Sequence, residues 1–328
     1  MNPEMKARLR KLSGLKRKCK GLLLCNPDRW ANPNFFWLSQ ASVSGWLWVP
    51  LNGRPRLFVR ETYREEARGT WAKVEYVTNL DDIFSAIPKT RIGLDVLHTP
   101  AQTLGKIRYR IKGLDVSRQM ESARAVKTPH EIRQIRKACA VARDVFGTIR
   151  LPYRGSEARL RADLEWEIQS RGLEPAFPTI VASGRAIAAP HHAPTTAPIR
   201  TPFLVDLGVR FGGYCSDTTR TYGSKYDTLI EAVFEAVEPM LKPGAKAAAL
   251  DAAARRAMSK HAKHFTTSLG HGIGIAVHEL PNIRAASKDV LQAGNVITIE
   301  PGIYVPSGIR HENVYLITKR GAEKLTDF

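Results

Sequence analysis

Four carboxylates and one histidine stand within or beside short apolar runs in the C-terminal half of the chain. They are Asp206, Asp217, His271, Glu300 and Glu312. An ionised carboxylate buried alone in an apolar strand costs several kcal/mol, or its pKa shifts until the group is neutral. A fold that buries all five groups therefore needs cations, and hard or borderline divalent metals bind oxygen and imidazole ligands. This pattern predicts a dinuclear metal hydrolase.

The spacing of these residues predicts strands. Asp206 ends an apolar run and Asp217 follows after a glycine-rich stretch, so we expect two neighbouring antiparallel strands joined by a tight turn. Glu300 follows the run VITI directly and precedes a Pro-Gly turn. Glu312 comes just before Val314, Leu316 and Ile317, and Arg310 lies two residues away on the same strand face. The carboxylates are therefore expected to converge on one face.

Each residue alone also fits a structural role. The aspartates could form turns beside glycines, Glu300 could pair with Arg310, and His271 could tolerate an unusual backbone between two glycines. All five occur together and in order, and this joint pattern favours the metal site.

The segments SDTTRT, GHGIGIAVHE, ITIEPGIY and GIRHEN resemble the pita-bread metallopeptidases. That family includes Xaa-Pro dipeptidase (prolidase), aminopeptidase P and methionine aminopeptidase. The resemblance covers roughly residues 120 to 328 well and the first part of the chain more loosely. It implies an α/β protein whose C-terminal pita-bread domain has a curved antiparallel sheet, preceded by a smaller α/β domain with a mixed sheet.

The resemblance also implies a role for each metal ligand. Asp217 and Glu312 would bridge the two metals, Asp206 would complete the ligands of one, and His271 with Glu300 those of the other. The metals would polarise the substrate carbonyl and supply hydroxide, and Glu300 would carry a proton from the water to the leaving amine. The ligand set favours manganese, with cobalt, iron or zinc as alternatives.

Two more histidines would support the reaction. His278 follows His271 by seven residues, a spacing that fits either a helix or a loop folded over the metals. The resemblance implies that His278 stabilises the developing oxyanion and that His191 helps hold the substrate. His192 directly follows His191, and the sequence leaves open which of the two faces the site. His278 and His191 could each also be a structural histidine, either hydrogen-bonded within the protein or exposed to solvent.

The substrate is expected to be a small peptide with proline at its second position. In similar prolidases an arginine that binds the dipeptide carboxylate stands where this chain has Asn282. Arg284, Arg310 or a basic residue of a partner subunit could bind that carboxylate, or the enzyme could act on longer peptides as aminopeptidase P does. The chain length favours a dipeptidase. A non-catalytic peptide- or protein-binding module or a metal-free, creatinase-like hydrolase is disfavoured because all five ligands are present.

Residues 1–117 and 118–328 are expected to form separate domains. The first begins with a basic helix to about Arg17 and alternates strands with helices, and Asn52-Gly53 predicts a hairpin. It resembles the N-terminal domain of the creatinase and prolidase branch, which methionine aminopeptidases lack.

Four helices are expected in residues 118–328, wrapped on a curved sheet that bears all five ligands. Thr128 to Glu131 form a capping box with proline at the first helical position, and Ser156 caps a second helix. Two more are predicted from about Asp227 to Pro243-Gly244 and from Ala247 to His261.

Composition limits the remaining possibilities. The formal net charge is +19, of which residues 1–199 carry about +16, yet no nucleic-acid-binding motif accompanies it. We interpret the excess as a dispersed, solvated surface and expect no nucleic-acid partner.

No apolar run is long enough to span a bilayer, and no cleavage site follows the basic N-terminal stretch. A cytoplasmic protein is expected, and the resemblance suggests a homodimer. The four cysteines lack CxxC spacing, so neither a zinc knuckle nor a disulfide framework is indicated.

Overall fold

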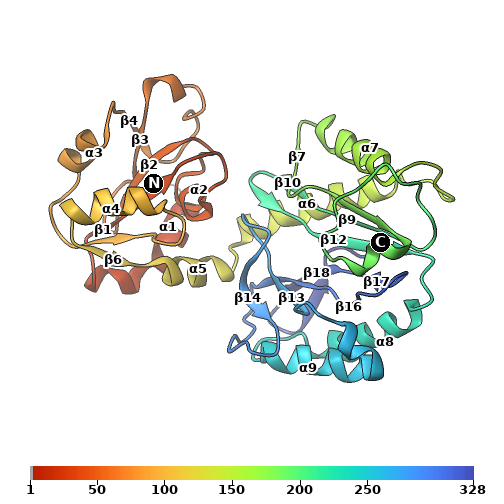
Figure 1. Cartoon of the computed structure of the whole chain (residues 1–328). Coiled ribbons are helices and arrows are strands. Elements are labelled where there is room, and N and C mark those ends of the chain that lie inside the picture. The colour runs from red at the N-terminus through yellow and green to blue at the C-terminus, as the bar shows by residue number, and fades with distance from the viewer. Residues whose placement is uncertain (1–2) are drawn as a thin grey trace. The chain divides into compact units, whose positions relative to one another are not determined.

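The computed structural model describes residues 3–328. The chain divides into two compact units, Met1–Arg124 and Ala125–Phe328 (Figure 1). The division falls within the last turn of helix α5 (Ser117–Ala125). Each unit has its own hydrophobic core and is described separately.

The first unit is built on a six-stranded mixed sheet with strand order β4-β3-β2-β1-β5-β6. Strand β1 runs antiparallel to β2 and parallel to β5, so the expected mixed sheet is confirmed. The hairpin expected at Asn52-Gly53 is also confirmed, because β2 and β3 pair antiparallel around it. The strands are β1 Gly21–Asn26, β2 Gly45–Pro50, β3 Arg56–Val59, β4 Lys73–Tyr76, β5 Ile92–Leu94 and β6 Gly113–Asp115.

Helices cover the sheet of the first unit. The basic opening segment forms two pieces, an α-helix and then a 3-10 helix, where Ser13 and Gly14 weaken helix propagation. A core beneath the later helices packs Leu23, Trp48 and Ile107 together. The helices are α1 Pro3–Lys11, α2 Pro33–Ser39, α3 Leu80–Ala86 and α4 Ala101–Arg110, with 3-10 turns at Ser13–Arg17 and Glu61–Tyr63.

The helices of the second unit begin where the sequence predicts. Thr128 and Glu131 form the expected capping box at the start of α6, and Ser156 accepts the Arg159 N–H at the start of α7. Helix α8 ends earlier than expected, because Pro239 lacks an N–H to continue it. The helices are α6 Pro129–Phe146, α7 Glu157–Gln169, α8 Asp227–Val237 and α9 Ala247–Met258, with 3-10 turns at Gly184–Ala188, Glu238–Met240 and Ser259–His264.

The strands of the second unit pair antiparallel in several groups. Their orders are β12-β9-β8, β14-β13-β15-β18-β19, β11-β10-β7 and β16-β17. The strands are β7 Glu174–Pro175, β8 Ile180–Ser183, β9 Phe203–Leu207, β10 Val209–Phe211, β11 Tyr214–Cys215, β12 Thr218–Tyr222, β13 Gly270–Gly272, β14 Glu279–Ile283, β15 Val296–Ile299, β16 Gly302–Ile303, β17 Ile309–Arg310, β18 Asn313–Ile317 and β19 Ala322–Lys324.

The connection between Asp206 and Asp217 differs from the expected tight turn. Strands β9 and β12 are antiparallel neighbours as predicted, but the β10–β11 hairpin lies between them in the chain. Gly212 and Gly213 both have positive φ, which lets this inner hairpin turn sharply. The two aspartates are thereby kept at the same end of β9 and β12.

Helices pack on the outer faces of these strands, as Figure 1 shows for α8 and α9. Ile230 of α8 and Leu250 of α9 share one core with Ile297 and Ile299 of β15. Leu160 of α7 belongs to another core with residues of β9. Because the helices cover one face of the strands, the opposite face is left to form a cavity.

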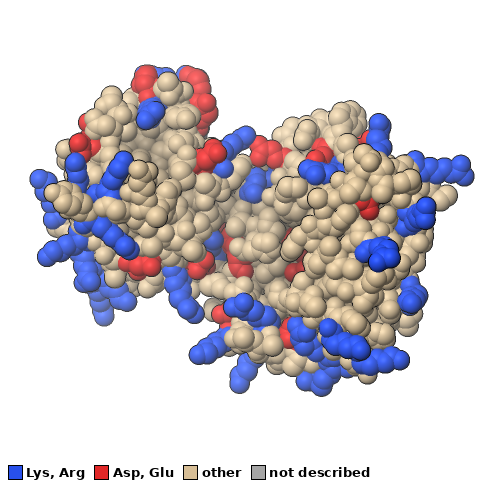
Figure 2. Space-filling view, viewed as in Figure 1, with Lys and Arg blue, Asp and Glu red and all other residues tan. Residues whose placement is uncertain are grey.

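Positive charge is spread over both units. Figure 2 shows Lys and Arg across the visible face, with fewer Asp and Glu. The first unit has 23 Lys and Arg against 11 Asp and Glu, and the second has 27 against 20. Within residues 3–328, no helix is both long and apolar enough to cross a membrane. All four cysteines are buried and free.

One ion pair is fully enclosed in the second unit. Lys127 Nζ lies 3.2 Å from Glu279 Oε2, and both side chains are almost completely buried. The same carboxylate accepts the backbone N–H groups of Ile275 and Ala276. Glu279 therefore holds the loop between β13 and β14, and Lys127 supplies the charge that makes its burial tolerable.

We expect Lys127→Met to destabilise the protein by about 3–5 kcal/mol, because it leaves the Glu279 carboxylate buried without its cation. Urea unfolding followed by circular dichroism measures this loss. The double variant Lys127→Met/Glu279→Gln should recover part of it, and Lys319→Met, at an exposed position, should change stability by less than about 0.5 kcal/mol. A Lys127→Met protein as stable as the unmodified one would contradict this account of the pair.

Candidate metal centre

The five expected ligands line one cavity of about 490 Å³ in the second unit. Strand pairing explains why they meet: β9 is adjacent to β12, and β15 lies between β13 and β18. The donors therefore come from neighbouring strands within two sheets. Asp206 lies on β9, Asp217 just before β12, His271 on β13, Glu300 just after β15 and Glu312 just before β18.

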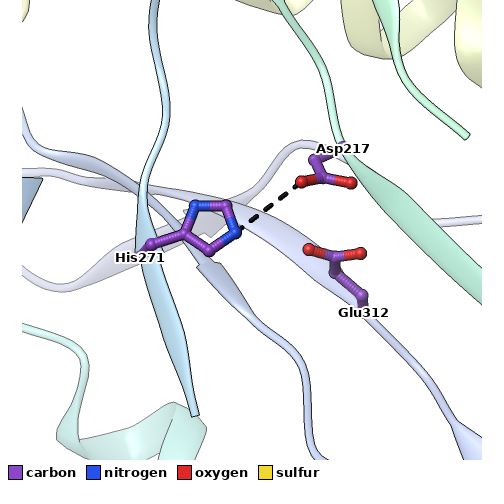
Figure 3. A group of neighbouring side chains, drawn as sticks. All are labelled: Asp217, His271 and Glu312. Carbon is purple, nitrogen blue, oxygen red and sulfur yellow. Dashed lines mark ion pairs between the residues drawn. The ribbon is translucent and has the colours of Figure 1, made fainter. Parts of the chain in front are cut away.

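Asp217, His271 and Glu312 form the tightest group. Their ligand atoms all lie within 4.8 Å of one another, and all three residues are buried. Figure 3 shows the imidazole of His271 pointing toward the Asp217 carboxylate, with the Glu312 carboxylate beside it. His271 Nε2 is 3.7 Å from Asp217 Oδ2.

Glu300 completes this side of the cavity. Its Oε1 atom is 3.4 Å from His271 Nε2. On the other side of the ring, His271 Nδ1 is 3.1 Å from the Gly272 carbonyl oxygen, so Nδ1 carries the proton and donates it there. This hydrogen bond leaves the Nε2 lone pair directed at the carboxylates, in the tautomer that a metal ligand needs.

Arg310 holds Asp206. Its Nη2 donates to Asp206 Oδ2 at 2.6 Å, and its Nε donates to Thr219 Oγ1 at 3.1 Å. Thr219 in turn donates its hydroxyl to Glu312 Oε2 at 2.9 Å. Only 5% of the Arg310 side chain is exposed. The guanidinium that we expected to contact substrate is thus bound within the protein, where it orients two of the carboxylates.

Burial and mutual repulsion shift the pKa values of the cluster. Desolvation, and then the charge of a neighbouring carboxylate, raise the pKa values of Asp217 and Glu312 well above their ordinary range. Desolvation also raises the pKa of Glu300 to about 7, against the lowering effect of Arg310. Desolvation, and then His278, lower the pKa of His271 to about 3, so the imidazole is neutral. One arginine does not balance this much buried negative charge.

The residues present fit divalent cations. Among residues 3–328, the buried Oδ1 atoms of Asp206 and Asp217 have no hydrogen-bond partner. Unsatisfied carboxylate oxygens are costly inside a protein, and a cation satisfies them. Carboxylates with one neutral imidazole are a donor set that suits manganese, iron, cobalt or zinc.

The supporting histidines line the same cavity. His278 lies in the loop between β13 and β14, not on a helix, and its ring centroid is 4.4 Å from that of His271. Desolvation, and then His191, lower the pKa of His278. His192 Nε2 is 2.9 Å from Glu157 Oε2, so the buried carboxylate at the start of α7 anchors His192.

Besides Arg310, the arginine that lines the cavity is not the one expected from the sequence. Arg284 is exposed and is absent from the cavity lining. Arg161 of α7 lines the cavity, although no sequence motif contains it. Tyr304 also lines it and accepts a long hydrogen bond from Arg310 Nη1 at 3.4 Å. Arg161 lies outside every quoted motif, whereas Tyr304 is the last residue of ITIEPGIY. Neither is marked as a cavity residue by the sequence alone, because its place there depends on how α7 and β16 pack against the strands.

With this geometry established, comparison with known proteins identifies the family. The sequence profile of metallopeptidase family M24 matches residues 133–319. The chain belongs to metallopeptidase family M24. An Xaa-Pro dipeptidase of Pyrococcus horikoshii is 35% identical over 90% of each chain. An Xaa-Pro dipeptidase of Pyrococcus furiosus is 40% identical over 63% of this M24 chain and 64% of the relative.

Solved structures confirm the fold class. The prolidase from Pyrococcus horikoshii superimposes with a TM-score of 0.86 at 31% identity, covering 99% of this chain and 98% of the other. The X-Pro aminopeptidase from Thermotoga maritima gives a TM-score of 0.89 at 26% identity, covering 98% and 97%. The expected pita-bread architecture preceded by a smaller α/β domain is therefore confirmed.

The raised carboxylate pKa values predict how the stability of metal-free protein depends on pH. Glu300, Asp217 and Glu312 hold protons in the folded state that the unfolded chain has released, so stability falls as pH rises through their folded pKa values. His271 opposes this trend only below about pH 6.5, where the unfolded histidine is charged. Between pH 6.5 and 8 we expect a loss of about 1 kcal/mol or more.

Chemical unfolding of chelator-treated protein at several pH values measures this slope. Excess Mn²⁺ should reverse it, because a metal binds the deprotonated ligands and stabilises the fold more as pH rises. Glu312→Gln should flatten the metal-free slope by removing one titrating carboxylate. Metal-free protein whose stability is constant or rises from pH 6.5 to 8 would show that these carboxylates are not protonated in the fold.

Proposed function

We propose that this M24 protein is a metal-dependent Xaa-Pro dipeptidase, which hydrolyses the bond before proline in a dipeptide. The observation that carries the proposal is the convergence of four carboxylates and a neutral imidazole in one buried cavity. The two Pyrococcus relatives are both Xaa-Pro dipeptidases, and one is similar along nearly the whole of this chain.

In this proposal the five clustered residues hold two divalent cations. Asp206, Asp217, His271, Glu300 and Glu312 would supply their ligand atoms. When bound, such a pair polarises a carbonyl and lowers the pKa of bound water. Manganese is the proposed metal, with cobalt, iron and zinc as alternatives.

The remaining residues bind substrate and move protons. Glu300 takes the proton from the attacking water and gives it to the proline nitrogen. That transfer is required because a secondary amine leaves only when protonated. His278 donates an N–H to the developing oxyanion, and His191 positions the peptide. Arg310 keeps Asp206 oriented throughout.

Aminopeptidase P activity is the second candidate. The Thermotoga maritima X-Pro aminopeptidase superimposes as well as the prolidase does, and Asn282 stands where similar prolidases have an arginine. An enzyme of this kind would accept a peptide that continues beyond proline. A non-catalytic module is disfavoured because such a protein has no need for all five ligands. A homodimer, a cytoplasmic location and a separate prolidase-like domain over residues 1–117 stay predictions.

Metal-stripped protein should hydrolyse Met-Pro only after manganese or cobalt is added. An Xaa-Pro-Xaa tripeptide should be a poorer substrate, because it places an uncharged amide where a dipeptide has its carboxylate. Released methionine, quantified by chromatography, reports both reactions. Preference for the tripeptide would favour aminopeptidase P, and hydrolysis of neither by metal-loaded protein would refute the peptidase assignment.

Glu300→Gln should reduce kcat for Met-Pro by about 10²- to 10⁴-fold, because the amide cannot shuttle the proton. Glu235→Gln, on the exposed side of α8, is the matched control and should keep full activity. Asp217→Ala should also abolish hydrolysis while circular dichroism shows the fold intact. A Glu300→Gln enzyme that retains activity at saturating metal would rule out this residue as the proton carrier.

A further inference from the structure

A dipeptidase must recognise a carboxylate close to the bond it cleaves. In an Xaa-Pro dipeptide the free carboxylate belongs to proline itself, so it lies within one residue length, roughly 4 Å, of the scissile carbonyl. A carboxylate brought into a partly buried cavity needs a cation or several N–H donors. The cavity that contains the five clustered ligands must therefore supply such a group near the metals.

Among the described residues that line this cavity, the arginines are Arg161 and Arg310. Arg310 is almost completely buried and already donates to Asp206, Thr219 and the Pro190 carbonyl. Arg161 is different, since 37% of its side chain is exposed. Its Nε donates to Glu165 Oε1 at 3.0 Å, and its two Nη groups have no hydrogen bond within residues 3–328.

Glu165 fixes Arg161 beside the metal centre. The same Oε1 atom accepts the backbone N–H of Thr179 at 3.0 Å. Thr179 precedes Ile180, and Ile180 pairs directly with Asp206 across β8 and β9. Glu165 and Thr179 therefore connect the guanidinium to β8, the strand that pairs with Asp206 of β9.

The wall beside Arg161 also contains an unsatisfied polar group. Thr179 lines the cavity and is completely buried, yet its Oγ1 has no hydrogen-bond partner in the described part of the chain. A buried hydroxyl without a partner is uncommon in a folded protein. Its position next to a guanidinium with open Nη groups marks this wall as the polar end of the cavity.

We propose that Arg161 binds the proline carboxylate of the substrate and so makes this chain selective for dipeptides. The proposal rests on the proposed Xaa-Pro peptidase function. Glu165 holds the Nε side of the guanidinium, and the two Nη groups face the carboxylate as a bidentate fork. The uncharged Asn282 is then compensated from a different element, helix α7, because Arg284 does not reach the cavity.

The test compares Met-Pro with its C-terminal amide, which removes the negative charge but keeps the scissile bond. The Mn²⁺-loaded enzyme should prefer the acid in kcat/KM. Arg161→Gln should raise KM for the acid by about 10- to 100-fold, the effect of losing hydrogen bonds to a charged group, and leave kcat nearly unchanged. Its ratio of acid to amide activity should fall to about one, and Arg161→Lys should restore part of the preference.

Arg159→Gln is the matched control. Arg159 lies on the same helix and forms an i,i+4 pair with Asp163 as Arg161 does with Glu165, but it is absent from the cavity lining. The control should leave KM and the acid-to-amide ratio unchanged. An Arg161→Gln enzyme that keeps the unmodified ratio would overturn the inference and leave the peptidase function standing.

Calorimetry separates the two proposals if neither compound is hydrolysed. If the unmodified protein binds Met-Pro acid more tightly than the amide, and Arg161→Gln loses that difference, the carboxylate site is supported while the peptidase function fails. Equal binding of acid and amide by the unmodified protein would overturn the inference.

Discussion

Electrostatic repulsion among buried carboxylates is the constraint on which the second unit depends. Asp217, Glu300 and Glu312 are enclosed with Asp206 in one cavity, and desolvation raises the pKa of each of the first three. Arg310 offsets only part of this charge. Such a cluster is unfavourable as an arrangement of side chains alone and becomes favourable when divalent cations share the oxygens. Membership of metallopeptidase family M24 agrees with this physical argument.

The surrounding fold positions the cluster. Helices α8 and α9 pack on β15 and β18, and helix α7 packs on β9, so the ligands face a cavity on the other side. Buried ion pairs and hydrogen bonds then fix the segments between strands. Glu279 with Lys127 holds the loop that carries His278, and Glu157 anchors His192 beside His191. The expected metal ligands and the supporting histidines are thus oriented by a second set of charged residues.

Local signals in the sequence predicted the elements well. The capping box at Thr128 and the hairpin at Asn52-Gly53 depend on residues close together in the chain, and both form as expected. The extent of continuous elements was harder to predict. Helix α8 stops at Val237 because Pro239 cannot continue its hydrogen bonds. An extra hairpin separates Asp206 from Asp217 because Gly212 and Gly213 allow a sharp turn. The spacing of apolar residues shows neither effect.

The sequence alone determined which residues could form the metal centre, because carboxylates beside apolar runs must be buried together and must then find cations. It also determined the family, since the motifs occur in order. Only the tertiary structure decided which other groups share the cavity. Arg161 enters it and Arg284 does not, and Arg310 turns inward to Asp206. Those outcomes depend on how α7 and the strands pack across long chain separations, which no local pattern encodes.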